Sequence, residues 1–395
     1  MCIGILMVYS ASMATAYADY GTPYYFAERE IIWAGAGLAA MGIAARISYH
    51  RWQQLALPIM GFTLLALVLV LIPHLGHMSH GARRWFSVGS GIEIQPSELV
   101  KLALVIYMAS WLTTKGERVR DFKATFVPFS MIVGLVALLI IKEPDLGTAI
   151  VIVVTMFAVL FVAGANPLHM LLVSGGAVSF VWMLIHTAGY RSGRLTAFID
   201  PWKHPTGVGY HTIQALLALG SGGIFGLGLG NSVQKYVLPA PHTDSILAVI
   251  GEEWGIVGTV VVLLLFMAIA YRGVRIALTA PDNFGKLLAI GITSWITFQA
   301  LLNYAVITSS VPFTGVPLPF ISYGGTSLIL SMAAIGILLN ISRHTAGEAL
   351  ARNNPDHGRG ERRSRVSRAG DRAAPAPIIE LSSARAGQGE LPSGQ

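Results

Sequence analysis

Three carboxylates lie at or just inside the edge of an apolar segment near the middle of the chain. Asp244 ends a polar loop, and Glu252 and Glu253 follow it within the apolar run. A charged side chain inside a membrane span costs several kcal/mol unless it is paired or has a function. The first carboxylate stands where a ligand could arrive, and a helix N-terminus favours its ionised form. Asp244 is therefore the candidate general base or metal ligand.

Glu252 and Glu253 differ from Asp244 in depth. On a helix that rises 1.5 Å per residue they lie about 12 Å further along, which is too deep for a base acting at the helix mouth. We expect them to be buried and to support neighbouring helices.

Arginine side chains offer a second kind of chemistry. Arg83, Arg84 and Trp85 are consecutive, and Arg191 and Arg194 occur in the longest non-membrane segment before the C-terminal tail. Guanidinium groups bind diphosphates through paired N–H donors. Arginine and tryptophan also anchor proteins at membrane interfaces, so both interpretations of these residues stay open.

The segment 95–101 is typical of a helix start, with a proline at the first position and Ser97 as its cap. Glu98 and Lys101 are three residues apart and therefore share a helix face. They form either a self-neutralised pair at the membrane interface or part of a polar cavity that contacts a headgroup.

Three loops have unusual composition. The turn 142–145 contains three charged residues, and Asp145 in it would favour the N-terminus of the next helix. The turn 315–327 contains two prolines and two adjacent glycines, so its free backbone groups must face protein or a polar cavity. The glycine-dense segment 220–230 fits no nucleotide fingerprint. We expect it to be irregular or a short helix that approaches a ligand closely.

The elements that position these residues are membrane helices. Of the 395 residues, 54% are hydrophobic and 12% are charged, with a mean hydropathy of +0.62, whereas soluble domains have about 25% charged residues. The fold class is therefore all-α, a polytopic membrane protein. About ten apolar segments approach the length that crosses a bilayer core of about 30 Å, at residues 1–16, 27–45, 55–74, 98–113, 124–141, 146–164, 168–187, 246–270, 286–308 and 322–341.

The first segment is shorter than a bilayer core, at about 24 Å. It ends in Ala16-Tyr17-Ala18, which resembles a signal-peptidase site, but no basic region precedes it. We expect a true first span that lacks its N-terminal part.

Lysine and arginine bias in the short loops predicts that both termini are cytoplasmic. The large loop 188–245, between spans seven and eight, then faces the outside. Residues 343–395 are basic and lack apolar periodicity, so we expect a disordered cytoplasmic tail that contacts membrane lipids. The formal charge of +7 is mainly a topology signal, and no nucleic-acid partner is expected.

Several site types are excluded by composition. The single cysteine, Cys2, excludes an internal disulfide framework and a cysteine-built metal site. The histidines lack zinc-site spacing, and there is no G-x-x-x-x-G-K-[ST] loop, so no nucleotide cofactor is expected.

Several of these motifs together resemble the SEDS family (shape, elongation, division and sporulation) of peptidoglycan polymerases. The resemblance covers about residues 5–343 and rests on motifs in the family's order: Gln95-Pro-Ser-Glu98, Pro144-Asp-Leu-Gly-Thr148, His242-Thr243-Asp244, Gly251-Glu252-Glu253 and Pro319-Phe-Ile-Ser-Tyr-Gly-Gly325. Asp200-Pro-Trp202 and the segments 228–231 and 339–343 are more similar to the division members than to the elongation members.

The resemblance implies a glycosyltransferase domain over residues 1–342 with ten spans, an outside-facing cavity and a lipid-accessible groove. The implied activity is polymerisation of lipid II into glycan strands during septal wall synthesis, with release of undecaprenyl diphosphate. The family's essential aspartate falls on Asp244. The substrate-binding candidates are Arg83, Arg84, Trp85, Glu98, Lys101, Asp145, Arg191, Arg194, His242, Thr243, Ser322 and Gly324.

Three positions depart from the family pattern, namely Pro241, Ser245 and Trp254. They affect the expected conformation of the loop and its contacts with partners, but they leave Asp244 in place.

The implied partners are lipid II, a class B penicillin-binding protein that acts as transpeptidase, other division-complex membrane proteins and membrane lipids. The expected location is the bacterial cytoplasmic membrane at the septum, with the active site facing outside. A carboxylate base contributes about 10²–10⁴-fold. Mg²⁺ or Mn²⁺, shared between Asp244 and the diphosphate, is the candidate cofactor. One base without a covalent intermediate implies inversion at the sugar.

Two other classes of function use the same residues. A lipid II flippase would also need intramembrane charges and a polar groove, and a non-catalytic division scaffold would retain the site without using it.

Overall fold

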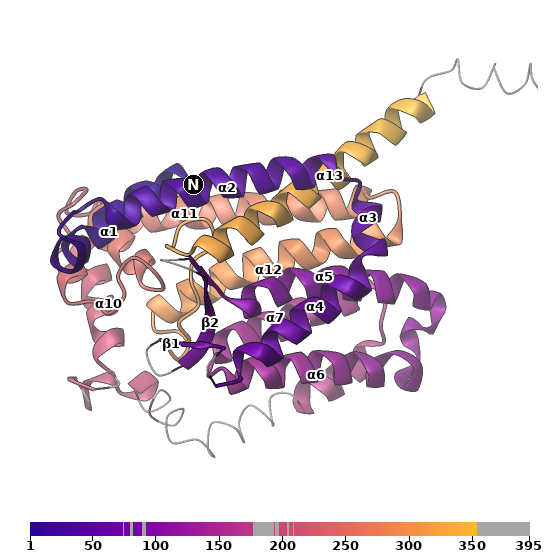
Figure 1. Ribbon diagram of the computed structural model, residues 1–395, viewed down its shortest axis with the longest axis horizontal. Coiled ribbons are helices and arrows are strands. Elements are labelled where there is room, and N and C mark those ends of the chain that lie inside the picture. Colours follow the sequence, from indigo (N-terminus) through magenta and orange to yellow (C-terminus); the bar gives the residue numbers. More distant parts are fainter. Residues whose placement is uncertain are drawn as a thin grey trace, which may run out of the picture. The chain divides into compact units, whose positions relative to one another are not determined.

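The computed structural model describes residues 1–73, 75–79, 82–88, 92–176, 193, 197–203, 205–207 and 209–353. It divides into two units, Met1–Thr345 and Ala346–Gln395. Helices make up most of the described part of the first unit (Figure 1).

Most of the helices follow the predicted apolar segments along the chain, but the helices at 49–54 and 210–222 correspond to none of them. In order they are α1 (Cys2–Tyr20), α2 (Tyr25–Arg46), α3 (Tyr49–Gln54), α4 (Ala56–Val70), α5 (Pro96–Lys115), α6 (Val127–Lys142), α7 (Leu146–Val162), α10 (Tyr210–Gly222), α11 (Ile246–Thr279), α12 (Asn283–Ile307) and α13 (Gly325–Asn353). Short 3-10 turns occur at Gly116–Arg120, Pro201–Lys203 and Gln234–Tyr236, and a π-helical turn at Phe122–Phe126. Residues 167–176 are also helical.

A small antiparallel sheet lies between α4 and α5, where no strand is predicted from the sequence. It consists of β1 (His77–Ser79), β2 (Ala82–Val88) and β3 (Ile92–Ile94), with β2 in the centre. Trp85 is opposite His77, and Phe86 is opposite Ile94. The prediction of an all-α fold is therefore incomplete in this loop, because strands this short show too few residues for a clear alternating pattern.

Five helices among the described residues are long and apolar enough to cross a membrane: α1, the segment Phe122–Lys142, α11, α12 and the segment Gly325–Thr345. The apolar helices α4 and α7 are shorter. The predicted segment 168–187 lies only partly within the described residues. Their length and composition support a multi-pass membrane protein, while the count of ten spans stays a prediction.

Several predicted segments end too early. Segment 246–270 is one of them, because α11 continues to Thr279. α1 continues to Tyr20 and so includes Ala16-Tyr17-Ala18 in its last turns, because the tyrosine and alanine residues there continue the helix without a break. α13 continues past residue 342 to Asn353, because this part of the expected tail is rich in the good helix formers Ala, Glu, Leu and Arg. The rest of the predicted tail lies outside the described residues.

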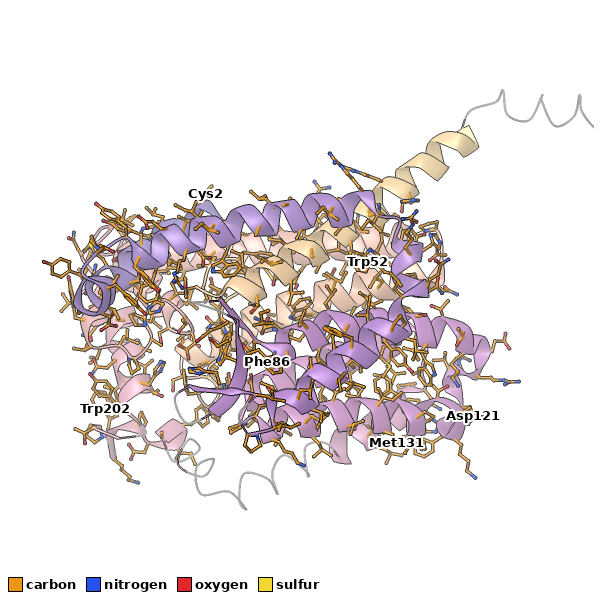
Figure 2. The ribbon with its side chains drawn as sticks, in the orientation of Figure 1. Cys2, Trp52, Phe86, Asp121, Met131 and Trp202 are labelled. Carbon is orange, nitrogen blue, oxygen red and sulfur yellow. The ribbon has the colours of Figure 1, made fainter. Side chains whose placement is uncertain are left out.

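Helix α12 is central to the packing. It contacts α11, α7 and α5, and Figure 1 shows it between α11 on one side and α5 and α7 on the other. Its Trp295 and Ile296 are almost completely buried. Large apolar side chains cover the outer surfaces instead, as at Met131 on α6 (Figure 2). Exposed apolar side chains on a helical surface of this kind fit a lipid environment.

Helix α11 is interrupted at Gly255, where φ is 66° and ψ is −163°. The segment that follows α10 enters this interruption. Four N–H to carbonyl hydrogen bonds of 3.0–3.1 Å join the two backbones: Leu227 to Glu252, Gly228 to Glu253, Ile256 to Gly223 and Val257 to Ile224. Backbone groups released by a helix break need such partners, because a membrane interior supplies none.

A glycine is required where the segment after α10 meets the interruption in α11, because the two backbones are in direct contact there. Gly226 has a φ of 79°, and a Cβ atom there would overlap the backbone of Glu253. The expectation that segment 220–230 approaches a ligand is therefore corrected, since its close neighbour is the chain's own α11. The insertion holds the chain that leads to Asp244 against α11.

Candidate functional site

Asp244 lies in the last turn before α11, which begins at Ile246. Its side chain is half-buried, and Thr243 Oγ1 donates a hydrogen bond to Oδ1 at 3.0 Å. A Cβ atom on Gly315 would lie 3.4 Å from Oδ2, so the carboxylate borders the loop between α12 and α13. The aspartate is thus partly accessible at the end of a helix, as the sequence predicts.

Two amides on α12 fix the loops around this carboxylate. The Asn303 Nδ2 group donates to the backbone oxygens of Asp244 at 2.9 Å and of Val316 at 2.8 Å. Gln299, one turn away, donates through Nε2 to the Pro317 oxygen at 2.9 Å. The backbone of the aspartate and the α12–α13 loop therefore share a rigid support.

Glu98 and Lys101 form a buried ion pair on α5. The Lys101 Nζ atom lies 2.6 Å from Glu98 Oε1, and both side chains are at most 3% exposed. Lys101 also donates to Gln299 Oε1 at 2.8 Å and lies 5.2 Å from the ring centre of Trp295. The pair is self-neutralised and is buried among the helices of the bundle. Its depth in the membrane stays a prediction.

The start of α5 also differs in detail from the prediction. The helix begins at Pro96, but its cap residue is Gln95 and Ser97 makes no capping bond. Ser97 Oγ instead accepts a hydrogen bond of 2.9 Å from Gln95 Nε2. Proline at the first helical position already removes one N–H that a cap would satisfy.

The turn between α6 and α7 receives Arg84 from β2. The Arg84 guanidinium donates to the backbone oxygen of Glu143 at 2.6 Å and to that of Pro144. Asp145 caps α7 by accepting bonds from the Thr148 backbone at 3.0 Å and side chain at 2.9 Å. These contacts fit a structural role for the turn, and they also fit a role in binding a ligand.

Glu143 is the buried carboxyl group of that turn. Its side chain is fully buried, and among the described residues neither of its oxygens has a hydrogen-bond partner. Burial and the nearby charge of Asp145 raise its pKa to about 9, against the opposing effect of Arg84. It is therefore neutral at physiological pH.

The two halves of the site meet at the α12–α13 loop. A Cβ atom on Gly147, in the first turn of α7, would overlap Val316 and touch Thr314. The neighbouring Gly315 borders the Asp244 carboxylate. The Asp145 turn, with Arg84 attached, and Asp244 thus lie on two sides of one short loop.

An aromatic group surrounds His242, two residues before Asp244. The His242 ring lies 4.4 Å from that of Phe26 on α2 and 5.7 Å from that of Tyr323, measured between centres. Burial lowers the pKa of His242 to about 4, so it is neutral. The Tyr323 N–H donates to the His242 carbonyl at 2.8 Å, which joins the loop before α13 to the loop before α11.

Ser322 and Gly324 flank this tyrosine. The Ser322 hydroxyl accepts a hydrogen bond of 2.8 Å from the Leu318 backbone and is buried. The Gly324 backbone forms a hydrogen bond with Glu30, a buried carboxyl group on α2. Both residues therefore have clear roles in shaping the loop, and their contact with substrate stays a prediction.

Glu252 and Glu253 lie behind the site. The Glu252 carboxylate accepts bonds from the Ser232 hydroxyl and from the backbone N–H of Val233 at 3.0 Å. Glu253 accepts a 2.5 Å bond from Ser10 on α1 and lies 3.6 Å from Lys235 Nζ, with both charged side chains fully buried. They hold the segment 232–235 and α1 against α11.

The remaining predicted residues are only partly placed. Trp85 is half-buried on β2, next to Arg84. The side chain of Arg83 and all of Arg191 and Arg194 lie outside the described residues.

Among the described residues, no three His, Cys, Asp or Glu side chains are grouped so as to hold a metal ion. The oxygen atoms near Asp244, a carboxylate and a hydroxyl, suit Mg²⁺ or Mn²⁺. These ions bind through one or two carboxylates together with substrate phosphates.

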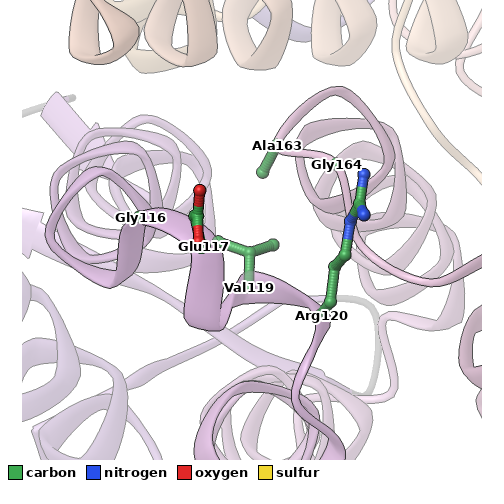
Figure 3. A pocket seen from close by; sticks show the side chains of 6 residues that line it. All are labelled: Gly116, Glu117, Val119, Arg120, Ala163 and Gly164. Atoms are coloured by element: carbon green, nitrogen blue, oxygen red, sulfur yellow. The ribbon is translucent and has the colours of Figure 1, made fainter.

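A separate cavity of about 440 Å³ lies at the opposite ends of α5 and α7 from Glu98 and Asp145. Figure 3 shows its lining: Gly116, Glu117, Val119, Arg120, Ala163 and Gly164. Because it lies at the C-terminal ends of these helices, it does not belong to the Asp244 site.

Sequence reasoning missed four side chains of the site. Gln299 and Asn303 are polar residues four apart in an apolar segment, a spacing that places both on one helix face. Arg29 and Glu30 are charged residues inside the predicted segment 27–45, and intramembrane charges mark functional sites. Arg29 lies 4.5 Å from the ring centre of Tyr25.

Comparison with known proteins gives consistent matches over the same part of the chain. The family model described as Cell cycle protein (FtsW, RodA, SpoVE) matches residues 1–347. The probable peptidoglycan glycosyltransferase FtsW of Geobacter metallireducens is 43% identical over 347 residues, 88% of this chain and 92% of that protein. Stage V sporulation protein E of Bacillus subtilis is 42% identical over 346 residues, covering 87% and 94%.

Two solved structures share the fold. A chain from a peptidoglycan synthase complex that coordinates polymerization and crosslinking has a TM-score of 0.68 at 30% identity, covering 87% of this chain and 97% of that one. The rod shape determining protein RodA of Thermus thermophilus has a TM-score of 0.61 at 29% identity, covering 87% and 96%. The chain described here belongs to the FtsW, RodA and SpoVE family of cell cycle proteins.

Proposed function

We propose that this protein is a peptidoglycan glycosyltransferase that polymerises lipid II, with Asp244 as the general base. The observation that carries the proposal is the position of Asp244. Its carboxylate is partly accessible and its backbone is anchored by Asn303. The names of the FtsW relatives and the synthase-complex neighbour support the reaction class.

The base step follows from the accessible carboxylate. A sugar hydroxyl is a poor nucleophile at neutral pH, and an oxygen of Asp244 would take its proton as the new C–O bond forms at the anomeric carbon. The bond from that carbon to the diphosphate breaks on the opposite side, and the diphosphate leaves with the electron pair. One displacement of this kind inverts the configuration of the sugar.

The leaving diphosphate needs positive charge. Arg84 is attached to the α6–α7 turn through two carbonyls, and these neutral partners leave its charge uncompensated. The charge of Lys101 is largely matched by Glu98. Arg84 is therefore the better-supported diphosphate ligand of the two.

A divalent cation fits the chemistry of this site. Asp244 and the hydroxyl of Thr243 would hold it, and when bound it would supply further positive charge to phosphate oxygens.

The membrane arrangement extends the observed spans. We propose ten spans with both termini cytoplasmic and with Asp244, the sheet and the loop 188–245 outside, at the division septum. The arginine and lysine distribution of the short loops supports this orientation. A class B penicillin-binding protein is the proposed partner, since the structural neighbour belongs to a complex that couples polymerization with crosslinking.

The test uses the full-length protein purified in detergent and incubated with lipid II, with and without a co-purified class B partner. Glycan strands should form and undecaprenyl diphosphate should be released. A flippase or a non-catalytic scaffold would give no strands where there is no bilayer to cross, and that result with both preparations would refute the polymerase assignment.

A further inference from the structure

Glu143 is the one glutamate among the described residues with both carboxyl oxygens buried and without a hydrogen-bond partner. It lies in the turn between α6 and α7, outside the helices themselves. An ionised carboxylate in such a place carries a desolvation penalty of several kcal/mol with no hydrogen bond to offset it, and the charge of Arg84 offsets this penalty only in part. The side chain is therefore stable there only as the neutral acid.

Arg84 approaches the same turn but contacts its backbone. The Nε and one Nη group donate to the carbonyls of Glu143 and Pro144, at the C-terminal end of α6, where the helix dipole favours a cation. Among the described residues, no carboxylate lies within 4.0 Å of the guanidinium. A guanidinium has five N–H donors, so this contact leaves donors for a ligand.

We propose that Glu143 is a positioning residue that acts as a neutral acid: it fills the turn beneath Arg84 without neutralising the guanidinium, which stays available to the substrate diphosphate. Arg84 is close enough to Glu143 to favour its ionisation, so an ionised Glu143 would compete with the diphosphate for the charge of Arg84. This inference rests on the proposed function, because it assigns the ligand of Arg84 from that reaction.

The charged groups that act on Glu143 identify the pH range of the effect. Asp145 in the same turn disfavours its ionisation and Arg84 on β2 favours it, while burial is the largest influence and brings the pKa to about 9. The neutral form therefore persists through physiological pH and is lost above about pH 9. At about pH 10 only about a tenth would remain neutral, so affinity for a diphosphate should be about tenfold lower than at about pH 7.5.

The experiment compares the wild type with Glu143→Gln, which keeps the shape and the neutrality but cannot ionise. Binding of undecaprenyl diphosphate to the purified proteins in detergent is measured at about pH 7.5 and about pH 10. The wild type should lose about tenfold more affinity than Glu143→Gln across this range. Glu117→Gln, at the cavity of Figure 3, removes an exposed carboxyl group far from the turn and should behave as the wild type.

A second measurement observes the proton directly. The infrared difference spectrum between the wild type and Glu143→Gln at neutral pH should contain the band of a protonated carboxyl group. Absence of that band, or equal loss of affinity in the wild type and Glu143→Gln, would overturn the proposal. Both readouts are independent of polymerisation, so failure to form strands would count against the proposed function alone.

Discussion

Asn303 offers a direct test of how the fold positions the base. Its side-chain amide donates to the backbone oxygens of Asp244 and Val316, and the residue is 1% exposed. In Asn303→Ala both buried oxygens lose their donor. At about 1–3 kcal/mol for each unsatisfied group, the free energy of unfolding should fall by about 2–6 kcal/mol.

Asn340 on α13 is the matched control. It is also buried, it donates to the Ala45 oxygen at 2.9 Å, and it accepts from the Tyr49 N–H at 2.9 Å. Asn340→Ala should therefore lower stability by a similar amount. Its contacts join α13 to the α2–α3 connection, and none of them reaches the Asp244 site.

The assay is lipid II polymerisation in detergent, with the apparent Tm measured on the same samples. Asn303→Ala should reduce kcat by about 10²-fold, because small displacements of a catalytic group have effects of that size. Asn340→Ala should lower the Tm comparably and change kcat little. Equal reduction of kcat in the two variants would show that Asn303 acts only through stability and would refute the positioning argument.

Three further predictions concern the surrounding structure. Gly226→Ala should destabilise the protein clearly more than Gly230→Ala, since both have positive φ but only the first places a Cβ atom against the α11 backbone; equal Tm values would contradict the insertion of this segment into α11. Glu98→Gln and Lys101→Met should each lower the free energy of unfolding by about 3–5 kcal/mol and thereby lower the Tm. The double variant should lose less than the sum of these two changes, because it leaves no buried charge unpaired. Strictly additive losses would argue against the ion pair. Because the pKa of Glu143 is raised in the folded protein, its contribution to stability is fully present below about pH 4.5 and is lost as the pH rises towards about 9. The Tm of the wild type should therefore decrease over this range more than the Tm of Glu143→Gln. Parallel Tm curves would contradict the burial of an ionisable group at this position.

Local sequence patterns were sufficient to predict most of the helices and the polar residues at the ends of some of them. The apolar run that begins near residue 246 predicted the start of α11. The spacing of Glu98 and Lys101 predicted their contact, because it matches the 3.6-residue helical repeat. Asp145 was correctly expected at the start of α7, because a helix N-terminus favours an anion.

Features that depend on distant contacts were not predictable in this way. The interruption at Gly255 exists because the segment 223–228 supplies partners for the released backbone groups, and no pattern within α11 encodes that partner. The attachment of Arg84 to the Glu143 and Pro144 carbonyls joins residues about sixty positions apart. The position of Ser97 alone predicted a helix cap. In the structure its hydroxyl accepts a hydrogen bond from the Gln95 side chain and does not cap the helix.

The central claim is that Asp244 is the base, and the most direct test is the rate of strand formation from lipid II by Asp244→Asn. Asp282→Asn is the control, since Asp282 caps α12 through Gly285 at 2.6 Å and asparagine also caps helices well. Asp244→Asn should remain folded and lose about 10²–10⁴-fold in rate, while Asp282→Asn should keep most of its activity. Strand formation by folded Asp244→Asn at the wild-type rate would contradict the account.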